Sequence, residues 1–295
     1  MNIKINEFNL PMKKSEPYGI TLGSDGFIWF TENGGNKIGK ISTTGAITEY
    51  PVPTPDAGIS CITKGNDRAL WFTEYKANKI GKITIEGEVT EYNIPTANAG
   101  PYGITIDADG AAWFTELACN KIGRITASGE IYEYDLPTPG SFPSMIITGP
   151  DEALWFTENQ SNRIGRITIA GAITEFNIPT PASGPVGICS GTDGCVWFVE
   201  IIGNKIGRIT TSGEFFEYPV PTENARPHTI VSGKEGDVWF TEWGSNKIGR
   251  ITSYGEIMEY KIPTIGAEPH GLVFGPDRAI WFAEEFDKIG QLIYE

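Results

Sequence analysis

The hydrophobic residues of this chain fall in short runs separated by turn sequences. The runs are four to seven residues long and rich in Ile, Val, Thr, Tyr and Trp, and sequences such as DG, GGN and SGE stand between them. Short runs of this composition between turn signals are typical of β-strands joined by hairpins. No stretch shows apolar residues at helical spacing over ten or more positions, which disfavours a helical solenoid. The pattern therefore predicts an all-β protein.

The strand pattern repeats along the whole chain. Seven tryptophans stand 42 residues apart, so seven periods account for 294 of the 295 residues. They are Trp29, Trp71, Trp113, Trp155, Trp197, Trp239 and Trp281. Each unit has room for four strands, near the sequences PYGITL, IWFTE, KIGRIT and ITEYPVP. Four-stranded units of about 40–45 residues arranged around an axis are the blades of a β-propeller.

The two ends of the sequence predict how the ring closes. Residues 5–11 align with residues 47–53, so the chain begins with a fourth strand, whereas the seventh unit stops after its third. If the first strand fills that vacancy, it pairs the open edges of the sheet. We therefore predict one seven-bladed β-propeller domain over residues 1–295, in which residues 3–11 complete the blade formed by about 266–295. A closed ring without a long free edge favours a monomer.

Charge and composition exclude several classes of protein. Lys plus Arg is 23 and Asp plus Glu is 37, a formal net charge of −14, which argues against binding nucleic acid or an anionic membrane. No apolar run approaches the roughly 20 residues that span a bilayer. The start, MNIKINEFNLPMKK, lacks the apolar core of a signal peptide. The four cysteines include no CxxC pair, which is typical of a reducing compartment, so we expect a cytoplasmic protein.

The candidate functional residues stand at positions where the seven repeat units carry different residues. One position at the entry to each first strand differs between units, which carry Tyr18, Ser60, Tyr102, Ser144, Val186, His228 and His270. Both histidines of the chain fall at this position, in adjacent blades, and first strands line the channel of a propeller. Histidine titrates near neutrality, so the pair is predicted to act as a base or a binding pair. The plainer alternative is that each imidazole only hydrogen-bonds a neighbour.

Carboxylates accompany the histidines. Glu268 stands two residues before His270, at a position where three other units have glycine. Glu284 belongs to the repeated WFTE glutamates, which are otherwise expected to be structural, but it is followed by Glu285 and by a turn one residue shorter. Two converging carboxylates repel each other unless a cation or proton intervenes, and oxygen ligands suit Mg²⁺. Ring closure places Tyr18 beside His270, so the unusual residues form one sector.

Familiar hydrolase signatures are missing from the sequence. It contains no Gly-rich phosphate loop, no GxSxG, no HExxH and no Cys–His metal spacing, which disfavours a serine or zinc hydrolase. Units of the form WFTE, NKIGRIT and GEITEYPVPT, with the RPH and EPHG segments, resemble the virginiamycin B lyase (streptogramin B lyase) family over essentially the whole chain. The presence of His228, Glu268, His270 and Glu284 makes that resemblance more specific than the repeat motifs alone do.

The resemblance implies an enzyme of antibiotic resistance. It implies a carbon–oxygen lyase that linearises cyclic depsipeptides of the streptogramin B class by Mg²⁺-assisted elimination at the threonine ester. His270 would be the general base, His228 and Tyr18 substrate contacts, and Glu268 and Glu284 the metal ligands, with Glu285 as a substitute for Glu284. The expected partner is this small antibiotic, with neither nucleic acid nor membrane.

Two other functions stay open at this stage. The first is a metal-dependent propeller lactonase or esterase that opens an ester with water. The second is a non-catalytic propeller that holds a peptide or protein on its top face. The mass of the product separates the first from a lyase, because elimination leaves an isomer of the substrate whereas hydrolysis adds one water.

Overall fold

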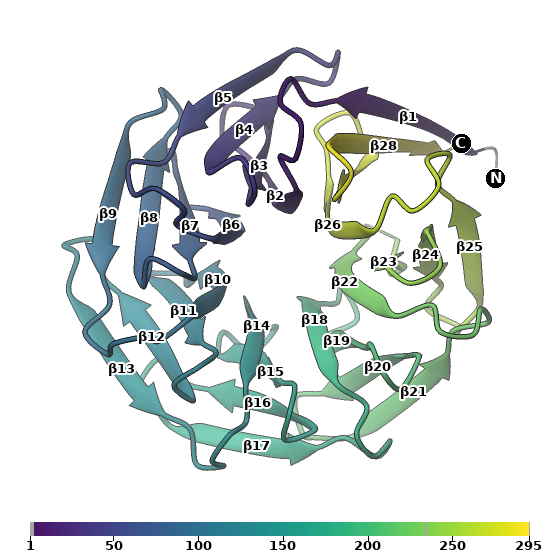
Figure 1. Cartoon of the computed structure of the whole chain (residues 1–295). Helices are drawn as coiled ribbons and strands as arrows, with labels where there is room; N and C mark the ends of the chain where they lie inside the picture. The colour runs from purple at the N-terminus through teal and green to yellow at the C-terminus, as the bar shows by residue number, and fades with distance from the viewer. Residues whose placement is uncertain (1–2, 234, 295) are drawn as a thin grey trace.

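The chain forms a ring of seven antiparallel sheets, each of four strands, around a central axis (Figure 1). This computed structural model describes residues 3–233 and 235–294. It confirms the prediction of an all-β, seven-bladed propeller. The domain expected over 1–295 also includes residues 1, 2, 234 and 295, which lie outside the described residues. The described part of the chain holds no helix that is long and apolar enough to cross a membrane.

The strands take equivalent places in every blade. Those that line the channel are β2 (Pro17–Leu22), β6 (Ile59–Lys64), β10 (Pro101–Ile106), β14 (Pro143–Thr148), β18 (Pro185–Ser190), β22 (Pro227–Ser232) and β26 (Pro269–Phe274). The second strands are β3 (Ile28–Glu32), β7 (Ala69–Glu74), β11 (Ala112–Glu116), β15 (Leu154–Glu158), β19 (Cys195–Glu200), β23 (Val238–Glu242) and β27 (Ile280–Glu284). The third strands are β4 (Lys37–Ile41), β8 (Lys79–Thr84), β12 (Lys121–Ile125), β16 (Arg163–Ile167), β20 (Lys205–Thr210), β24 (Lys247–Ile251) and β28 (Lys288–Tyr294). The outer strands are β5 (Ile47–Pro51), β9 (Val89–Asn93), β13 (Ile131–Asp135), β17 (Ile173–Asn177), β21 (Phe215–Pro219), β25 (Ile257–Lys261) and β1 (Ile3–Asn9).

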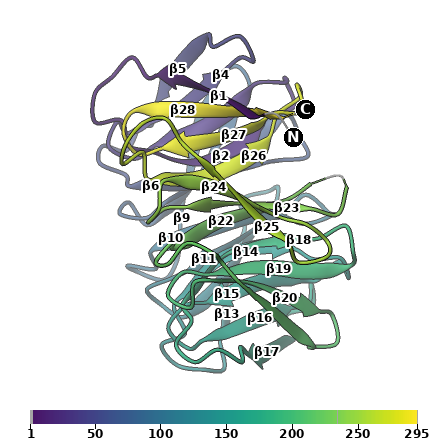
Figure 2. The ribbon, with the colours of Figure 1, turned by 90° about the vertical axis from the view of Figure 1, so that its right-hand side faces the viewer.

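The last blade is a composite of both ends of the sequence, as predicted. Its strand order is β1-β28-β27-β26, and β1 pairs antiparallel with β28 from Ile3 opposite Tyr294 to Asn9 opposite Lys288. The two strands lie side by side in both views (Figure 1, Figure 2). Ring closure therefore sets the seventh blade beside the first, which is the arrangement that the candidate site requires.

The closing strand repeats contacts that join the other blades. Glu7 on β1 accepts hydrogen bonds from the Thr264 backbone at 3.0 Å and from the Lys288 ammonium at 3.3 Å. In the second blade Glu91 makes the same pair of contacts with Thr54 and Lys79. These are charge-assisted hydrogen bonds between half-buried groups, so they fix the strand register as well as adding stability.

The hydrophobic core lies between neighbouring blades. Trp29 and Ile38 of the first blade pack against Leu70 and Phe72 of the second, and all four side chains are buried. The consecutive apolar residues of the second strands fit this arrangement, because such strands are covered on both faces. Replacing a buried aromatic side chain by Ala costs about 3–5 kcal/mol in protein cores, so the repeated WF pairs carry much of the stability.

The WFTE glutamates are fully buried in all seven blades, in line with the structural role expected for most of them. They are Glu32, Glu74, Glu116, Glu158, Glu200, Glu242 and Glu284. Burial is the main reason that the pKa of Glu74 rises from 4.5 to about 7, and the charge of Glu91 adds to the effect. A folded-state pKa above the unfolded value stabilises the fold fully below about pH 4.5, and this stabilisation is lost as the pH rises through about 7.

The Glu74→Gln variant is expected to lose less stability than the wild type between pH 5 and pH 9, because its side chain never ionises. A shift of this kind corresponds to a difference on the order of 1–3 kcal/mol in the change of unfolding free energy. Urea unfolding at the two pH values measures it. The matched control is Glu86→Gln, which changes an exposed glutamate of the same blade. Equal pH dependence in Glu74→Gln and the wild type would contradict the ionisation of Glu74.

Candidate active site

The first strands present one side chain each to the mouth of the channel. In β2, β22 and β26 the pairing with the neighbouring strand is irregular between the first and fourth residues, Pro227 to Ile230 in β22 and Pro269 to Leu272 in β26. The first strands of all seven blades have this irregularity, so it is part of the scaffold that re-aims the side chains at the mouth. The residue that follows the leading proline is Tyr18, His228 or His270, depending on the blade.

The backbone just before these strands is left-handed, which favours glycine. Gly58, Gly100 and Gly184 take φ values of 66°, 62° and 64° there. Glu268 occupies the same place with φ 48°, and Arg226 with φ 49°. A non-glycine residue at such a φ costs on the order of 1 kcal/mol, so its side chain is expected to have a use.

Three aromatic rings from three blades meet at one mouth of the channel. The His228 and His270 ring centroids are 4.8 Å apart in an edge-to-face arrangement. The Tyr18 ring lies 4.4 Å from that of His270 and 5.8 Å from that of His228. Trp243 stands over the group, with its ring 6.4 Å from His270. The structure thus brings Tyr18, His228 and His270 together, as ring closure led us to expect.

The carboxylate in contact with this group is Glu285. Its Oε2 lies 3.0 Å from Nε2 of His270, and the hydrogen bond from His270 is the main cause that lowers the pKa of Glu285. Glu268 interacts with Glu285, and its own pKa is raised, first by burial and then by the neighbouring Glu285 carboxyl. Two carboxyl groups whose pKa values move apart share one site for a proton or a cation.

Glu284, which sequence reasoning favoured, lies elsewhere. Its side chain is fully buried, and its pKa is raised to about 8 by burial and by the charge of Glu7, with Lys288 opposing. Glu284 is the last residue of β27 and lies near Glu7 and Lys288, whereas Glu285 begins the following turn and contacts His270, so the two side chains face different directions. The signal for Glu285 was present in the sequence, because this residue and the shortened turn set the seventh unit apart.

Burial controls the ionisation of His228. Burial, and then the charge of His270, lower the pKa of His228 to about 3, so it stays neutral at physiological pH. The expectation that both imidazoles titrate near neutrality is therefore wrong for His228. Its Nε2 lies 3.3 Å from the Tyr18 hydroxyl and its Nδ1 lies 3.2 Å from the Thr229 hydroxyl.

Tyr102 is a neighbour of the site that sequence reasoning did not select. Its hydroxyl hydrogen-bonds the hydroxyl of Tyr18 from across the channel. Burial raises the pKa of both phenols, so both remain protonated. The hint in the sequence was that two of the seven equivalent positions hold tyrosine.

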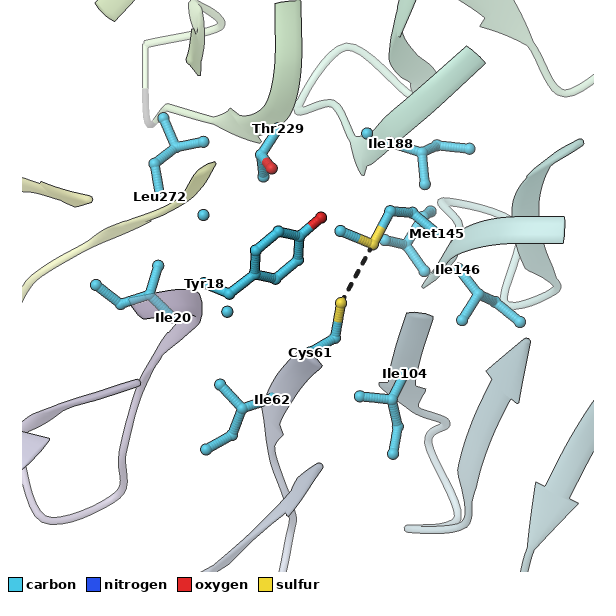
Figure 3. A pocket seen from close by; sticks show the side chains of 14 residues that line it. Tyr18, Ile20, Cys61, Ile62, Ile104, Met145, Ile146, Ile188, Thr229 and Leu272 are labelled. Carbon is cyan, nitrogen blue, oxygen red and sulfur yellow. Dashed lines mark hydrogen bonds between the residues drawn. The ribbon is translucent and has the colours of Figure 1, made fainter. Parts of the chain in front are cut away.

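The channel below this layer is an apolar cavity of about 140 Å³. Figure 3 shows the Tyr18 ring pointing into it, surrounded by aliphatic side chains, with the Cys61 sulfur 3.6 Å from that of Met145. Burial raises the pKa of Cys61 to about 12, which keeps it an unreactive thiol. The Cys61 thiol of this cavity is therefore not a candidate acid or base.

The rim above the site offers apolar contact area. Tyr75, Phe142, Phe286 and Ile202 are 39%, 42%, 56% and 74% exposed. Tyr75, Ile202 and Phe286 belong to the turns after the second strands, on the side of the ring that carries Trp243 and Glu285. Exposed charged residues such as Glu16, Lys76 and Arg226 lie between them, so the rim offers apolar contact area interrupted by polar groups.

The profile of the virginiamycin B lyase family matches residues 3–292. The chain belongs to that family. Virginiamycin B lyase from Staphylococcus aureus is 56% identical over 55 residues, which are 19% of this chain and 18% of that protein. Virginiamycin B lyase from Bacillus licheniformis is 55% identical over 47 residues, 16% of each chain. The matched segments thus span less than a fifth of these curated relatives.

Solved structures of the family match the full chain. A streptogramin B lyase structure is 54% identical with a TM-score of 0.98, covering 100% of this chain and 99% of that one. A catalytically inactive H270A virginiamycin B lyase from Staphylococcus aureus with quinupristin is 55% identical with a TM-score of 0.96, covering 100% of both. The family that the repeat motifs predicted is confirmed.

Proposed function

We propose that this virginiamycin B lyase family member inactivates streptogramin B antibiotics by opening their ring at the threonine ester through β-elimination. The observation that carries the proposal is the contact of His270 with Glu285, beside Glu268, Tyr18 and His228, at one mouth of the channel. Full-length similarity to a structure that contains quinupristin, and that is inactive as the H270A variant, supports it.

We infer that Glu268 and Glu285 hold Mg²⁺. Their carboxyl groups interact at a half-buried position, where a divalent cation would remove the repulsion that raises the pKa of Glu268. Among the described residues no group of three or more acidic, His or Cys side chains is placed to hold a metal. A pair of carboxylates leaves positions for water and substrate, which suits Mg²⁺. When bound, the ion polarises the amide carbonyl next to the threonine α-carbon and so makes the α-proton more acidic.

His270 then acts as the general base. A ring nitrogen of its neutral imidazole takes the α-proton, and the imidazolium that forms can donate from Nε2 to Glu285. The electron pair of the C–H bond becomes the Cα=Cβ double bond as the ester C–O bond breaks. The threonine residue is left unsaturated, and the carboxyl end of the peptide leaves as a carboxylate. Water takes no part, in keeping with the lack of a nucleophile motif.

His228 and Tyr18 serve as substrate contacts in this proposal. His228 is neutral near physiological pH, so its ring can contact the substrate without competing for the proton. Tyr18 keeps its hydroxyl proton and packs against His270, which holds the imidazole in place. The apolar residues of the rim supply contact area for an antibiotic rich in aromatic groups.

The proposal is tested by incubating the protein with a streptogramin B and Mg²⁺ and weighing the product. We expect a linear product of the same mass as the substrate, containing one new double bond. A repeat in ¹⁸O-labelled water is expected to leave no label in the product. A product heavier by one water, with label incorporated, would instead establish a hydrolytic esterase, and recovery of unchanged substrate would favour a propeller that only binds.

We also propose that the protein works as a cytoplasmic monomer. Support for the monomer comes from β1, which covers the edge of the last blade and closes the ring. Sedimentation of the purified protein at micromolar concentration tests the monomer, and fractionation of the producing cells tests the location.

A further inference from the structure

We propose that Tyr102 is a positioning residue of this active site. Its hydroxyl holds the hydroxyl of Tyr18 in place, and through it the imidazole of His228. The inference rests on the proposed lyase function, which it extends by one residue that does not itself reach the reacting atoms.

The contacts form a chain across the channel. Tyr18 comes from the first blade and Tyr102 from the third, and their hydroxyl groups hydrogen-bond each other. The Tyr18 oxygen lies 3.3 Å from Nε2 of His228 in the sixth blade. Tyr18 therefore has one polar partner on each side, while the face of its ring rests on His270. Without the Tyr102 hydroxyl, the phenol of Tyr18 loses the partner that opposes His228.

Hydrogen bonds to the backbone that join neighbouring blades differ at the strands that carry Tyr18 and His228. Threonines of the WFTE motif tie each second strand to the carbonyl of the next blade's first strand, with oxygen distances of 2.7–2.9 Å. They are Thr31, Thr73, Thr115, Thr157 and Thr241. Two units have Val199 and Ala283 instead, which carry no hydroxyl.

The two missing threonines fall beside the site. By the 42-residue period, Val199 faces the carbonyl of His228 and Ala283 faces that of Tyr18. Gly187 and Gly271 approach the same two carbonyls so closely that a Cβ atom would lie 2.5 Å and 2.6 Å from them. Close packing is thus kept while the hydrogen bond from a threonine is absent.

Tyr102 stands on an anchored strand. Its carbonyl accepts the hydrogen bond of Thr73 at 2.8 Å. The strands of Tyr18 and His228 are tied to the threonine of their own blade, through the backbone N–H groups of Gly19 and Thr229, but lack the bond from the neighbouring blade. The Tyr102 hydroxyl therefore links these two side chains to a strand that has both bonds. The direction of these hydrogen bonds is set at the His228 end of the row. When the Tyr18 hydroxyl donates to Nε2 of His228, the ring proton of His228 is on Nδ1 and is donated to the Thr229 hydroxyl, 3.2 Å away.

Tyr102→Phe removes one hydroxyl and keeps the ring. Loss of a neutral hydrogen bond that orders Tyr18 and His228 is expected to lower kcat about fivefold to tenfold, with KM changed by less than about twofold. The matched control is Tyr92→Phe on the outer strand of the second blade, for which no change is expected. In a Tyr18→Phe background the Tyr102 substitution is expected to add nothing, because its effect passes through the Tyr18 hydroxyl.

A second measurement does not depend on activity. The chain has two histidines, so the ring ¹⁵N signals of His228 can be assigned with one His270→Ala sample. Tyr102→Phe is expected to shift the His228 Nε2 signal in the same direction as Tyr18→Phe but by less, while Tyr92→Phe leaves it unchanged. An unmoved His228 signal, or additive losses in the double variant, would overturn the inference. If the wild type fails to open a streptogramin B, the lyase proposal falls, whereas the ¹⁵N spectra still decide whether Tyr102 orders His228.

Discussion

Replacing His270 by Ala is expected to reduce the opening of a streptogramin B ring to the background rate. General-base catalysis contributes about 10²–10⁴-fold, and the remaining groups of the site offer no substitute. His228 cannot take over, because its pKa of about 3 leaves it too weak a base near neutrality. We therefore expect kcat to fall by about 10³-fold or more, measured as product formed under saturating Mg²⁺.

The fold is expected to survive this substitution. His270 lies at the mouth of the channel, outside the clusters that join the blades, and its Nδ1 has no hydrogen-bond partner among the described residues. The matched control is Ser144→Ala, which removes a hydroxyl group from the equivalent position on the opposite side of the ring. Near-normal turnover in His270→Ala, with an unchanged circular dichroism spectrum in both variants, would remove His270 from the role of base.

Glu285→Gln is expected to weaken Mg²⁺ binding, so that the Mg²⁺ concentration needed for half-maximal activity rises at least about tenfold. The substitution keeps the shape of the side chain and removes the negative charge that contacts His270 and that we propose balances the cation. Glu268→Gln is expected to act in the same direction. The measurements are the Mg²⁺ titration of activity and, independently of turnover, Mn²⁺ binding followed by electron paramagnetic resonance.

Glu284→Gln provides the decisive comparison. Glu284 is adjacent in sequence but buried beside Glu7 and Lys288, so its amide variant is expected to keep the wild-type Mg²⁺ requirement. The opposite result, in which Glu284→Gln raises the requirement and Glu285→Gln does not, would return the metal site to Glu284. Chelation by EDTA is expected to stop the wild type and added Mg²⁺ to restore it, and activity that ignores EDTA would refute the metal assignment for both residues.

The architecture could be predicted because it depends on local repetition. A period of 42 residues, short β-branched and aromatic runs and frequent turns leave few alternatives to a propeller of four-stranded blades. Closure was predictable for the same reason, since residues 5–11 match a fourth strand that the seventh unit lacks. The pairing of β1 with β28 satisfies strand edges that would otherwise stay open.

The part of the ring that holds the site was also predictable, but the full set of residues that form the site was not. Departures from the repeat selected Tyr18, His228, His270 and Glu268, since a scaffold of equal units does not require them. The sequence favoured Glu284 and kept Glu285 as its substitute; the contact with His270 is made by Glu285, because Glu284 is buried at the end of β27 whereas Glu285 begins the next turn. The ionisation of His228 was missed because it depends on burial and on a second imidazole 4.8 Å away between ring centroids.

The sequence alone determined the number of blades, the composite seventh blade and the region of the ring where the units differ, because these follow from the spacing of residues along the chain. Only the tertiary structure decided which carboxylate meets His270, that His228 stays neutral, and that Tyr102 reaches Tyr18 from two blades away. The physical reason is that side-chain direction, desolvation and contacts across the channel depend on distances in space between residues that are up to 210 positions apart.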